Sequence, residues 1–133
     1  EYGPKEGLAS EQQTPVVFEG HLLGIMPKGA GALRDQLVCV HPSDFNRVVW
    51  SSGQDMRFGL GPYMIADNKL FILNDDGTLV IARPSTREYT ELDRYRVIEG
   101  NDAWGPLALA DGYMVMRDAK TMVCLDLAAR RNN

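Results

Sequence analysis

Side chains that commonly carry catalysis or bind metals are scarce in this sequence. It contains two histidines, His21 and His41, and two cysteines, Cys39 and Cys124. No Cys-x-x-Cys pair occurs, so we expect no zinc site. Each cysteine lies inside an apolar run, "QLVCVHP" or "TMVCLDL", which favours two buried free thiols; a disulfide is the less favoured alternative.

Other stretches with chemical associations lack the context that their chemistry requires. The stretch "GAGALR" has no third glycine of a dinucleotide fingerprint and no predicted helix after it. The stretch "NDDGT" begins like a calcium loop, but Ile72 and Arg83 stand where that loop needs acids, so we predict a β-turn. No Gly-x-Ser-x-Gly elbow occurs. We therefore predict no catalytic residue, no metal ligand and no cofactor, and a non-enzyme is favoured over an enzyme.

Charge and hydropathy narrow the class of partner. The chain has 133 residues, with 14 Lys and Arg against 18 Asp and Glu, a net charge of −4. This balance argues against nucleic acid, because a surface that binds phosphates needs clustered positive charge. No apolar run approaches the roughly 20 residues of a membrane-spanning helix, so we expect no membrane span. The chain opens at Glu1 without a methionine, so we expect a processed or excised piece whose export signal would lie upstream.

Three segments of the chain share one plan, which indicates an internal repeat. Each has a proline, a mainly apolar run, a short turn and a second apolar run: "TPVVFEGHLLGI" (14–25), "GPYMIADNKLFIL" (61–73) and "GPLALADGYMVM" (105–116). The prolines follow one another after 47 and then 44 residues, at Pro15, Pro62 and Pro106. The turns suit tight hairpins, because Asp, Asn and Gly tolerate positive φ. They are Glu19-Gly20, Asp67-Asn68 and Asp111-Gly112.

A third apolar run follows in each repeat, and a fourth follows in the first two. The third runs are "QLVCVHP", "GTLVIARPS" and "KTMVCLDL", and the fourth are "NRVVWSSG" and "YTELDRYRVIEG". A helix is an alternative for the last run, but its Tyr, Thr, Val and Ile content favours a strand. Four short strands in about 40 to 50 residues is the period of a propeller blade. We predict an all-β protein of about three four-stranded antiparallel blades, forming an incomplete propeller.

The predicted blades span about 14–57, 58–101 and 102–133, and residues 1–13 form an extension or a strand that completes a blade. The first two runs of each repeat are almost continuously apolar, which is typical of strands covered on both faces. The predicted core is made of these runs and of parts of the third. It comprises Val16, Val17, Leu22, Leu23, Val38, Met64, Ile65, Leu70, Ile72, Leu79, Ile81, Leu107, Leu109, Met114, Val115 and Val123.

The run "LVCVHPSDFNRVVW" resembles the blade motif of pyrroloquinoline-quinone-like propeller repeats, in which a strand ending in Asp is followed by a turn and Gly-Lys-x-x-Trp. Residues 38–41 stand in the place of that strand, and Val48, Val49 and Trp50 stand in the place of its tryptophan-bearing partner. In "MVCLDLAARRNN", Leu125 and Asp126 keep the usual form, but no tryptophan follows. The resemblance covers residues 14–127. It implies a quinoprotein-like β-propeller, a family with quinone-dependent dehydrogenases, outer-membrane assembly lipoproteins and exported proteins of unknown role.

The resemblance implies a closed propeller of about six to eight blades, and this chain supplies fewer than three. We therefore expect a C-terminal fragment of a longer propeller, or chains that associate to cover the open blade faces. The third blade lacks a fourth strand, and the resulting edge at residues 121–125 invites strand addition. We expect a dimer or larger assembly, held by blade packing or by an exchanged N-terminal segment. The alternative is a monomer whose N-terminus folds back over one blade face.

The loops between the strands hold the side chains that could bind a ligand: Arg57, Phe58, Asp102, Trp104 and Arg117. Alternatively, Phe58 and Trp104 wedge between blades. The family's dehydrogenases use adjacent cysteines, a calcium cage and a stacked tryptophan, and no adjacent cysteine pair occurs here. We predict a non-catalytic scaffold or interaction module of a periplasmic or otherwise extracytoplasmic protein, binding a protein or glycan through its loop face. The alternative is a fragment of a quinone-dependent dehydrogenase.

Overall fold

β-Strands are the main secondary structure of the computed structural model, which describes Leu8 and residues 11–128. The only helical segment in this part of the chain is the short 3-10 turn η1 (Gly31–Leu33). The strands are β1 (Val16–Phe18), β2 (His21–Ile25), β3 (Leu37–His41), β4 (Asp44–Ser51), β5 (Tyr63–Ala66), β6 (Lys69–Leu73), β7 (Thr78–Arg83), β8 (Thr90–Arg96), β9 (Ala108–Ala110), β10 (Tyr113–Arg117) and β11 (Met122–Asp126). The prediction of an all-β protein is confirmed, and so is the strand predicted for the fourth run of the second repeat.

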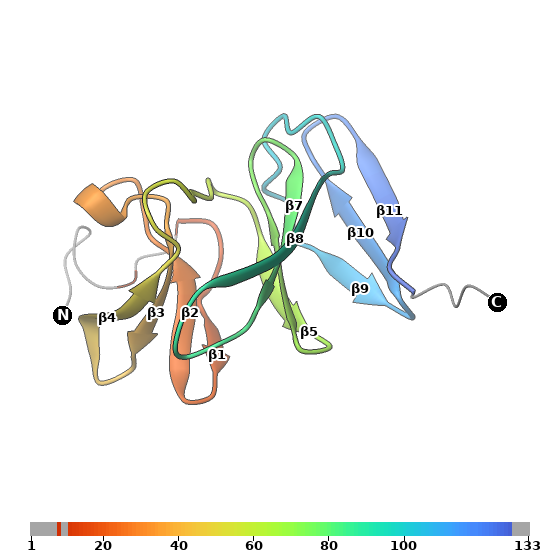
Figure 1. Ribbon diagram of the computed structural model, residues 1–133. Coiled ribbons are helices and arrows are strands. Elements are labelled where there is room, and N and C mark those ends of the chain that lie inside the picture. Colours follow the sequence, from red (N-terminus) through yellow and green to blue (C-terminus); the bar gives the residue numbers. More distant parts are fainter. Residues whose placement is uncertain (1–7, 9–10, 129–133) are drawn as a thin grey trace.

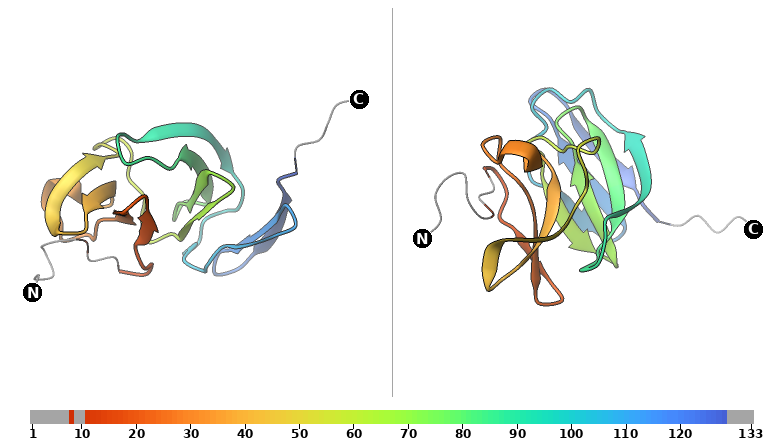
Figure 2. Two further views of the ribbon diagram at one scale, coloured as in Figure 1. Left: turned by 90° about the horizontal axis from the view of Figure 1, so that it is seen from below. Right: turned by 60° about the vertical axis from the view of Figure 1, so that its left-hand side comes forward.

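The strands form three antiparallel sheets that follow one another along the chain (Figure 1). Sheet 1 has the order β1-β2-β3-β4, sheet 2 has the order β5-β6-β7-β8, and sheet 3 has the order β9-β10-β11. Each sheet is a meander in which consecutive strands pair. The views in Figure 2 show the three sheets arranged in succession, from sheet 1 near the N-terminus to the blue sheet 3 near the C-terminus. None closes on itself, so the arrangement is that of an incomplete propeller.

The first hairpin of every sheet closes through two residues with positive φ. Their φ values are 45° at Glu19 and 73° at Gly20, 47° at Asp67 and 53° at Asn68, and 50° at Asp111 and 80° at Gly112. Positive φ at both central residues defines the type I′ turn, whose twist matches that of the flanking strands. The three hairpins predicted from the sequence are therefore confirmed, together with the reason for their turn residues.

Sheet 2 is covered on both faces, because successive residues of its strands point to opposite sides. One face packs against sheet 1 in a cluster that includes Leu23, Leu37, Leu70, Ile72 and Val80. The other face packs against sheet 3 in a cluster that includes Phe71, Leu73, Leu79, Met114 and Met116. All ten side chains are at most 4% exposed. This two-sided burial explains the continuously apolar runs in the sequence.

Three sequence predictions of burial are wrong, and each concerns a strand near the end of the sheet stack. Val17 is 70% exposed, because β1 is an edge strand and its central side chain points away from the inter-sheet core. Val115 is only half-buried and Cys124 is exposed. These two residues pair with each other across β10 and β11 and lie on the outer face of sheet 3, against which no other sheet of the described residues packs.

Part of the outer face of sheet 1, in contrast, is covered from within the chain. Val38 and Val40 on this face are fully buried. Leu8 packs against their cluster and lies over Gly24, where an added Cβ would come within 3.0 Å of the Leu8 side chain. Residues 11–13 form bends rather than a strand, and most of the predicted 1–13 extension lies outside the described residues. The two ends of the sheet stack therefore differ, since Leu8 covers part of one and no described sheet covers the other.

The described residues contain no helix that is both long and apolar enough to cross a membrane.

Candidate binding groove at the open edge

Two of the five predicted ligand-binding residues, Arg57 and Phe58, lie in the loop between sheets 1 and 2. Arg57 donates hydrogen bonds to the carbonyl oxygens of Gln54, at 3.0 Å, and Arg34. Phe58 is 1% exposed and packs in the core between the sheets, with its ring centroid 6.3 Å from that of Tyr89. Phe58 is therefore a wedge between two sheets and offers no surface to a ligand.

Of the other three predicted residues, Asp102 and Trp104 lie in the loop between sheets 2 and 3, and Arg117 is the last residue of β10. Asp102 is exposed and has a positive φ of 54°. Trp104 is 41% exposed, and its backbone N–H donates to the Asp102 carbonyl oxygen at 2.9 Å. The Arg117 side chain lies over Gly105, where an added Cβ would come within 2.9 Å of it. Four of the five residues thus lie in two inter-sheet loops and Arg117 ends β10, and of the two aromatic rings only that of Trp104 is exposed.

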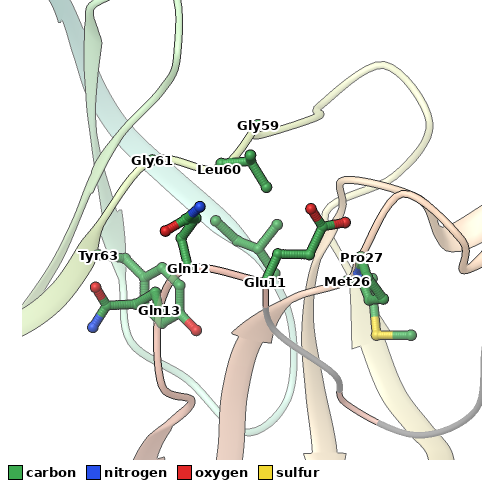
Figure 3. Close-up of a pocket in the computed structure, with 10 residues that line it drawn as sticks. Glu11, Gln12, Gln13, Met26, Pro27, Gly59, Leu60, Gly61 and Tyr63 are labelled. Carbon is green, nitrogen blue, oxygen red and sulfur yellow. The ribbon is translucent and has the colours of Figure 1, made fainter. Parts of the chain in front are cut away.

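A small pocket lies where the N-terminal segment meets the loop between sheets 1 and 2. Its lining comes from residues 11–13, from Ile25, Met26 and Pro27, and from residues 59–61 with Tyr63 (Figure 3). Its cavity volume is about 10 Å³, which is the space of one water molecule. Such a pocket cannot hold an organic ligand, so it is not the candidate site.

The candidate site is an apolar groove between sheets 2 and 3. Two cavities of about 440 Å³ and 460 Å³ share Ile81 and Leu127 in their walls. The first opens beside the hairpin turns of the two sheets, and the second opens between β7, β8 and β11. The apolar lining residues are Phe71, Leu79, Ile81, Val97, Leu109, Leu125 and Leu127. Volumes of this size accommodate several side chains of a binding partner.

The groove lies where sheet 3, in the described part of the chain, has no fourth strand. The fourth strand of sheet 1 supplies Trp50, and Tyr89 comes directly before the fourth strand of sheet 2; their rings lie 6.2 Å apart between these two sheets. The Trp50 indole N–H also donates to the Ser85 carbonyl oxygen at 3.0 Å. Among the described residues, no strand flanks β11 on its outer side, so the equivalent position beside sheet 3 is empty.

Within the described residues, the backbone groups on the outer side of β11 have no strand to pair with. The Thr121 carbonyl oxygen accepts from Asp118 N–H at 2.9 Å, and Leu127 N–H donates to Gly112 at 2.8 Å, so both point toward β10. Because backbone groups alternate in direction along an antiparallel strand, the N–H and C=O groups of Met122, Cys124 and Asp126 point to the open edge. An unpaired strand beside an apolar groove is the arrangement that accepts an added strand.

The charged groups at the end of the groove are mainly acidic. The lining residues there include Asp67, Asp111 and Asp126, and Lys69 is their one cation among the described residues. The Lys69 ammonium already pairs with the Asp67 carboxylate at 3.3 Å. The rim therefore favours a partner that brings positive charge next to an apolar segment.

Shifted pKa values occur near the strand ends and have structural explanations. Asp118 is 2% exposed and accepts four backbone N–H groups, from Gly100, Asn101, Lys120 and Thr121. The donors of Lys120 and Thr121, at 2.8 and 2.7 Å, contribute most to lowering the pKa of its carboxyl group. Burial raises the pKa of the Cys39 thiol to about 11.

Tyr89 and Glu91 have shifted pKa values beside the outer rim of sheets 1 and 2. The pKa of the Tyr89 phenol is raised, chiefly by burial and then by the Glu91 carboxylate. The pKa of Glu91 is lowered by its hydrogen bonds with Arg94, which measure 2.5 and 2.6 Å. These groups stabilise the fourth strand of sheet 2, and none of them lines the groove.

The histidines form no metal site with other described residues. The His21 and His41 rings stand edge to face with centroids 5.4 Å apart, on neighbouring strands. Within the described chain, no three His, Cys, Asp or Glu side chains come close enough to hold a metal ion.

Sequence reasoning anticipated the open edge but not the groove beside it. The signal for the edge was the missing fourth run in the third repeat. The groove is lined by residues from both sides of the boundary between sheets 2 and 3. Nothing in the sequence pattern indicates that Ile81 and Leu127 line the same groove. Comparison with protein-family models finds no match, and no curated protein is significantly similar to this chain.

Proposed function

We propose that this protein is a non-catalytic interaction module that binds an extended segment of another protein. The segment adds as a strand to β11 and places side chains into the groove between sheets 2 and 3. The quinoprotein-like propeller relationship and the periplasmic or otherwise extracytoplasmic location belong to the same proposal. They rest on the sequence resemblance alone.

One observation carries the proposal: the unpaired edge and the apolar groove coincide. The outward-pointing groups of Met122, Cys124 and Asp126 lie along the same opening as Leu125 and Leu127. The main chain of an added strand would satisfy the edge, and alternate side chains would fill the groove. Main-chain bonds then supply affinity and the side-chain pockets supply selectivity.

The loop face is the weaker site for a protein or glycan. Only Trp104 exposes a large apolar surface there, and Phe58 is buried. A quinone-dependent dehydrogenase is the alternative function from the resemblance. Addition of pyrroloquinoline quinone with Ca²⁺ tests it, because a specific site would raise the melting temperature of the protein.

A displayed library of random ten-residue peptides tests the proposed function. Selection is run on the wild-type protein and on Cys124→Pro, which removes one outward N–H and blocks the edge without removing a bond to β10. Cys124→Ser is the matched control, since it keeps the backbone donor. We expect peptides that bind wild type and Cys124→Ser but not Cys124→Pro, with unchanged circular dichroism. Failure to enrich such peptides, or equal binding to all three proteins, refutes the proposal.

A further inference from the structure

The two complete sheets show what kind of strand fits the open edge, because their third strands are equivalent to β11. β3 reads "LVCVH" and β11 reads "MVCLD", so Cys39 and Cys124 occupy matching positions. The faces match as well. Val123 and Leu125 lie on the face of sheet 3 that packs against sheet 2, the preceding sheet. The equivalent Val38 and Val40 lie on the corresponding face of sheet 1, which is its outer face.

The strand that β3 accepts is β4, and its side chains cover both faces of the sheet. Trp50 lies opposite Cys39, and Val48 lies opposite Val40. Val48 packs on the outer-face cluster with Val40, while Trp50 packs between sheets 1 and 2. One residue, Val49, is bulged out between them, since the register shifts at this point.

The same irregularity occurs in sheet 2. Asp93 lies opposite Ile81 and Glu91 lies opposite Ala82, so one residue is again extra at the equivalent place. A fourth strand on this fold therefore brings two side chains, separated by one bulged residue, to opposite faces of the sheet. On sheet 3 the first would enter the groove over Leu125, and the second would lie on the outer face over Cys124.

Both of these positions on sheet 3 are apolar. The groove side is formed by Leu79, Ile81 and Val97 of sheet 2 together with Leu125. The outer face carries Met122, which is 71% exposed, and the exposed Cys124. An aliphatic side chain fits the first position, and an aromatic side chain, like Trp50 on sheet 1, covers the second.

The edge of sheet 3 differs from that of sheet 1 in its charge. Asp44 of β4 lies opposite His41 of β3, and the residue of β11 that matches His41 is Asp126. An Asp opposite Asp126 would place two carboxylates side by side, which destabilises a cross-strand pair. A basic residue at this point forms an opposite-charge pair and also meets the acidic rim with Asp111.

Resting on the proposed function, we infer that the β11 edge recognises an antiparallel partner segment of defined chemistry. The segment carries a basic residue opposite Asp126, an aliphatic residue over Leu125 in the groove, and, two positions after the latter, an aromatic residue over Cys124. The order and spacing follow β4, in which Asp44, Val48 and Trp50 hold these positions, and a second register shift places residues 45–47 between Asp44 and Val48.

A synthetic peptide based on the chain itself tests this inference. The probe is "SDFNRVVWSS" (residues 43–52), labelled with a fluorophore and compared with the same peptide carrying Asp44→Lys. Fluorescence anisotropy measures the Kd for the intact protein. We expect the lysine peptide to bind about two- to fivefold more tightly than the parent, the range of an exposed ion pair. Peptides with Val48→Asp or Trp50→Asp should lose binding.

Charge exchange in the protein provides the decisive control. In Asp126→Lys the preference should reverse, so that the parent peptide binds more tightly than the lysine peptide. Cys124→Pro should bind neither peptide. Equal affinities in both proteins, or binding that survives Val48→Asp, overturn the inference.

The peptide experiment separates failure of the inference from failure of the proposed function. If the random library yields edge-dependent peptides without this pattern, the inference falls and the proposed function stands. If light scattering shows a dimer that Cys124→Pro dissociates, the occupant of the edge is a second copy of the chain and the inference also falls.

Discussion

Substitution of Phe58 tests most directly whether the loop between sheets 1 and 2 is an architectural wedge or a ligand site. Phe58 is 1% exposed and packs in the core cluster shared by the two sheets. Phe58→Ala removes this ring, and we expect it to lower the free energy of unfolding by about 3–5 kcal/mol. Trp104 is the aromatic residue of the next inter-sheet loop but is 41% exposed. We expect Trp104→Ala to cost only about 1 kcal/mol.

Urea denaturation at 25 °C, followed by circular dichroism, measures both changes. A domain of this size has an unfolding free energy of about 5–15 kcal/mol, so Phe58→Ala leaves a measurable native state in most of this range. With a slope of about 2 kcal/mol per M, its midpoint should fall by about 1.5–2.5 M. If Phe58→Ala does not fold, Phe58→Leu should still fold, with a cost below about 1.5 kcal/mol. A cost below about 1 kcal/mol for Phe58→Ala, or an equal cost for Trp104→Ala, refutes the wedge.

Three further outcomes follow from the structure. An aromatic disulfide reagent at pH 8 should label Cys124 at once and Cys39 only on unfolding, because Cys39 is buried and its thiol pKa is raised to about 11. Asp118→Ala should lower the urea midpoint at pH 7 but less at pH 3. The pKa of the Asp118 carboxyl group is lower in the folded state, so the ionised group stabilises the folded protein above its unfolded-state pKa. This stabilisation is lost as falling pH protonates the carboxylate. Gly61→Ala should destabilise strongly, because its Cβ would stand 1.6 Å from the Leu73 carbonyl oxygen, whereas Gly20→Asn at a positive-φ turn should be tolerated.

Local chemistry explains why the hairpins were predictable. The turn at Asp67 and Asn68 needs positive φ at both positions, and those residue types accept it, so the sequence pattern and the observed turn agree. The continuous apolar run of β6 likewise predicts burial on both faces, and Leu70 and Phe71 are buried on opposite sides. Strand identity, hairpin closure and the three-unit repeat therefore followed from properties of short segments.

The burial of the end sheets did not follow, because it depends on what lies next to each sheet. Cys39 and Cys124 stand in nearly identical apolar runs, yet one is buried and the other exposed. Sheet 1 has a neighbour on one face and Leu8 against the other, whereas no other sheet of the described residues lies against the outer face of sheet 3. No pattern within the run around either cysteine carries that difference.

The sequence by itself determined the strands, their hairpin turns and the number of repeats, because turn chemistry and apolar periodicity act over a few residues. Only the tertiary structure decided that Phe58 is a wedge and that Ile81 and Leu127 share one groove. Those two groove residues are far apart in the chain and come together only when sheets 2 and 3 pack. Burial and cavity shape are properties of packed surfaces, so the candidate site became visible only once the sheets were in place.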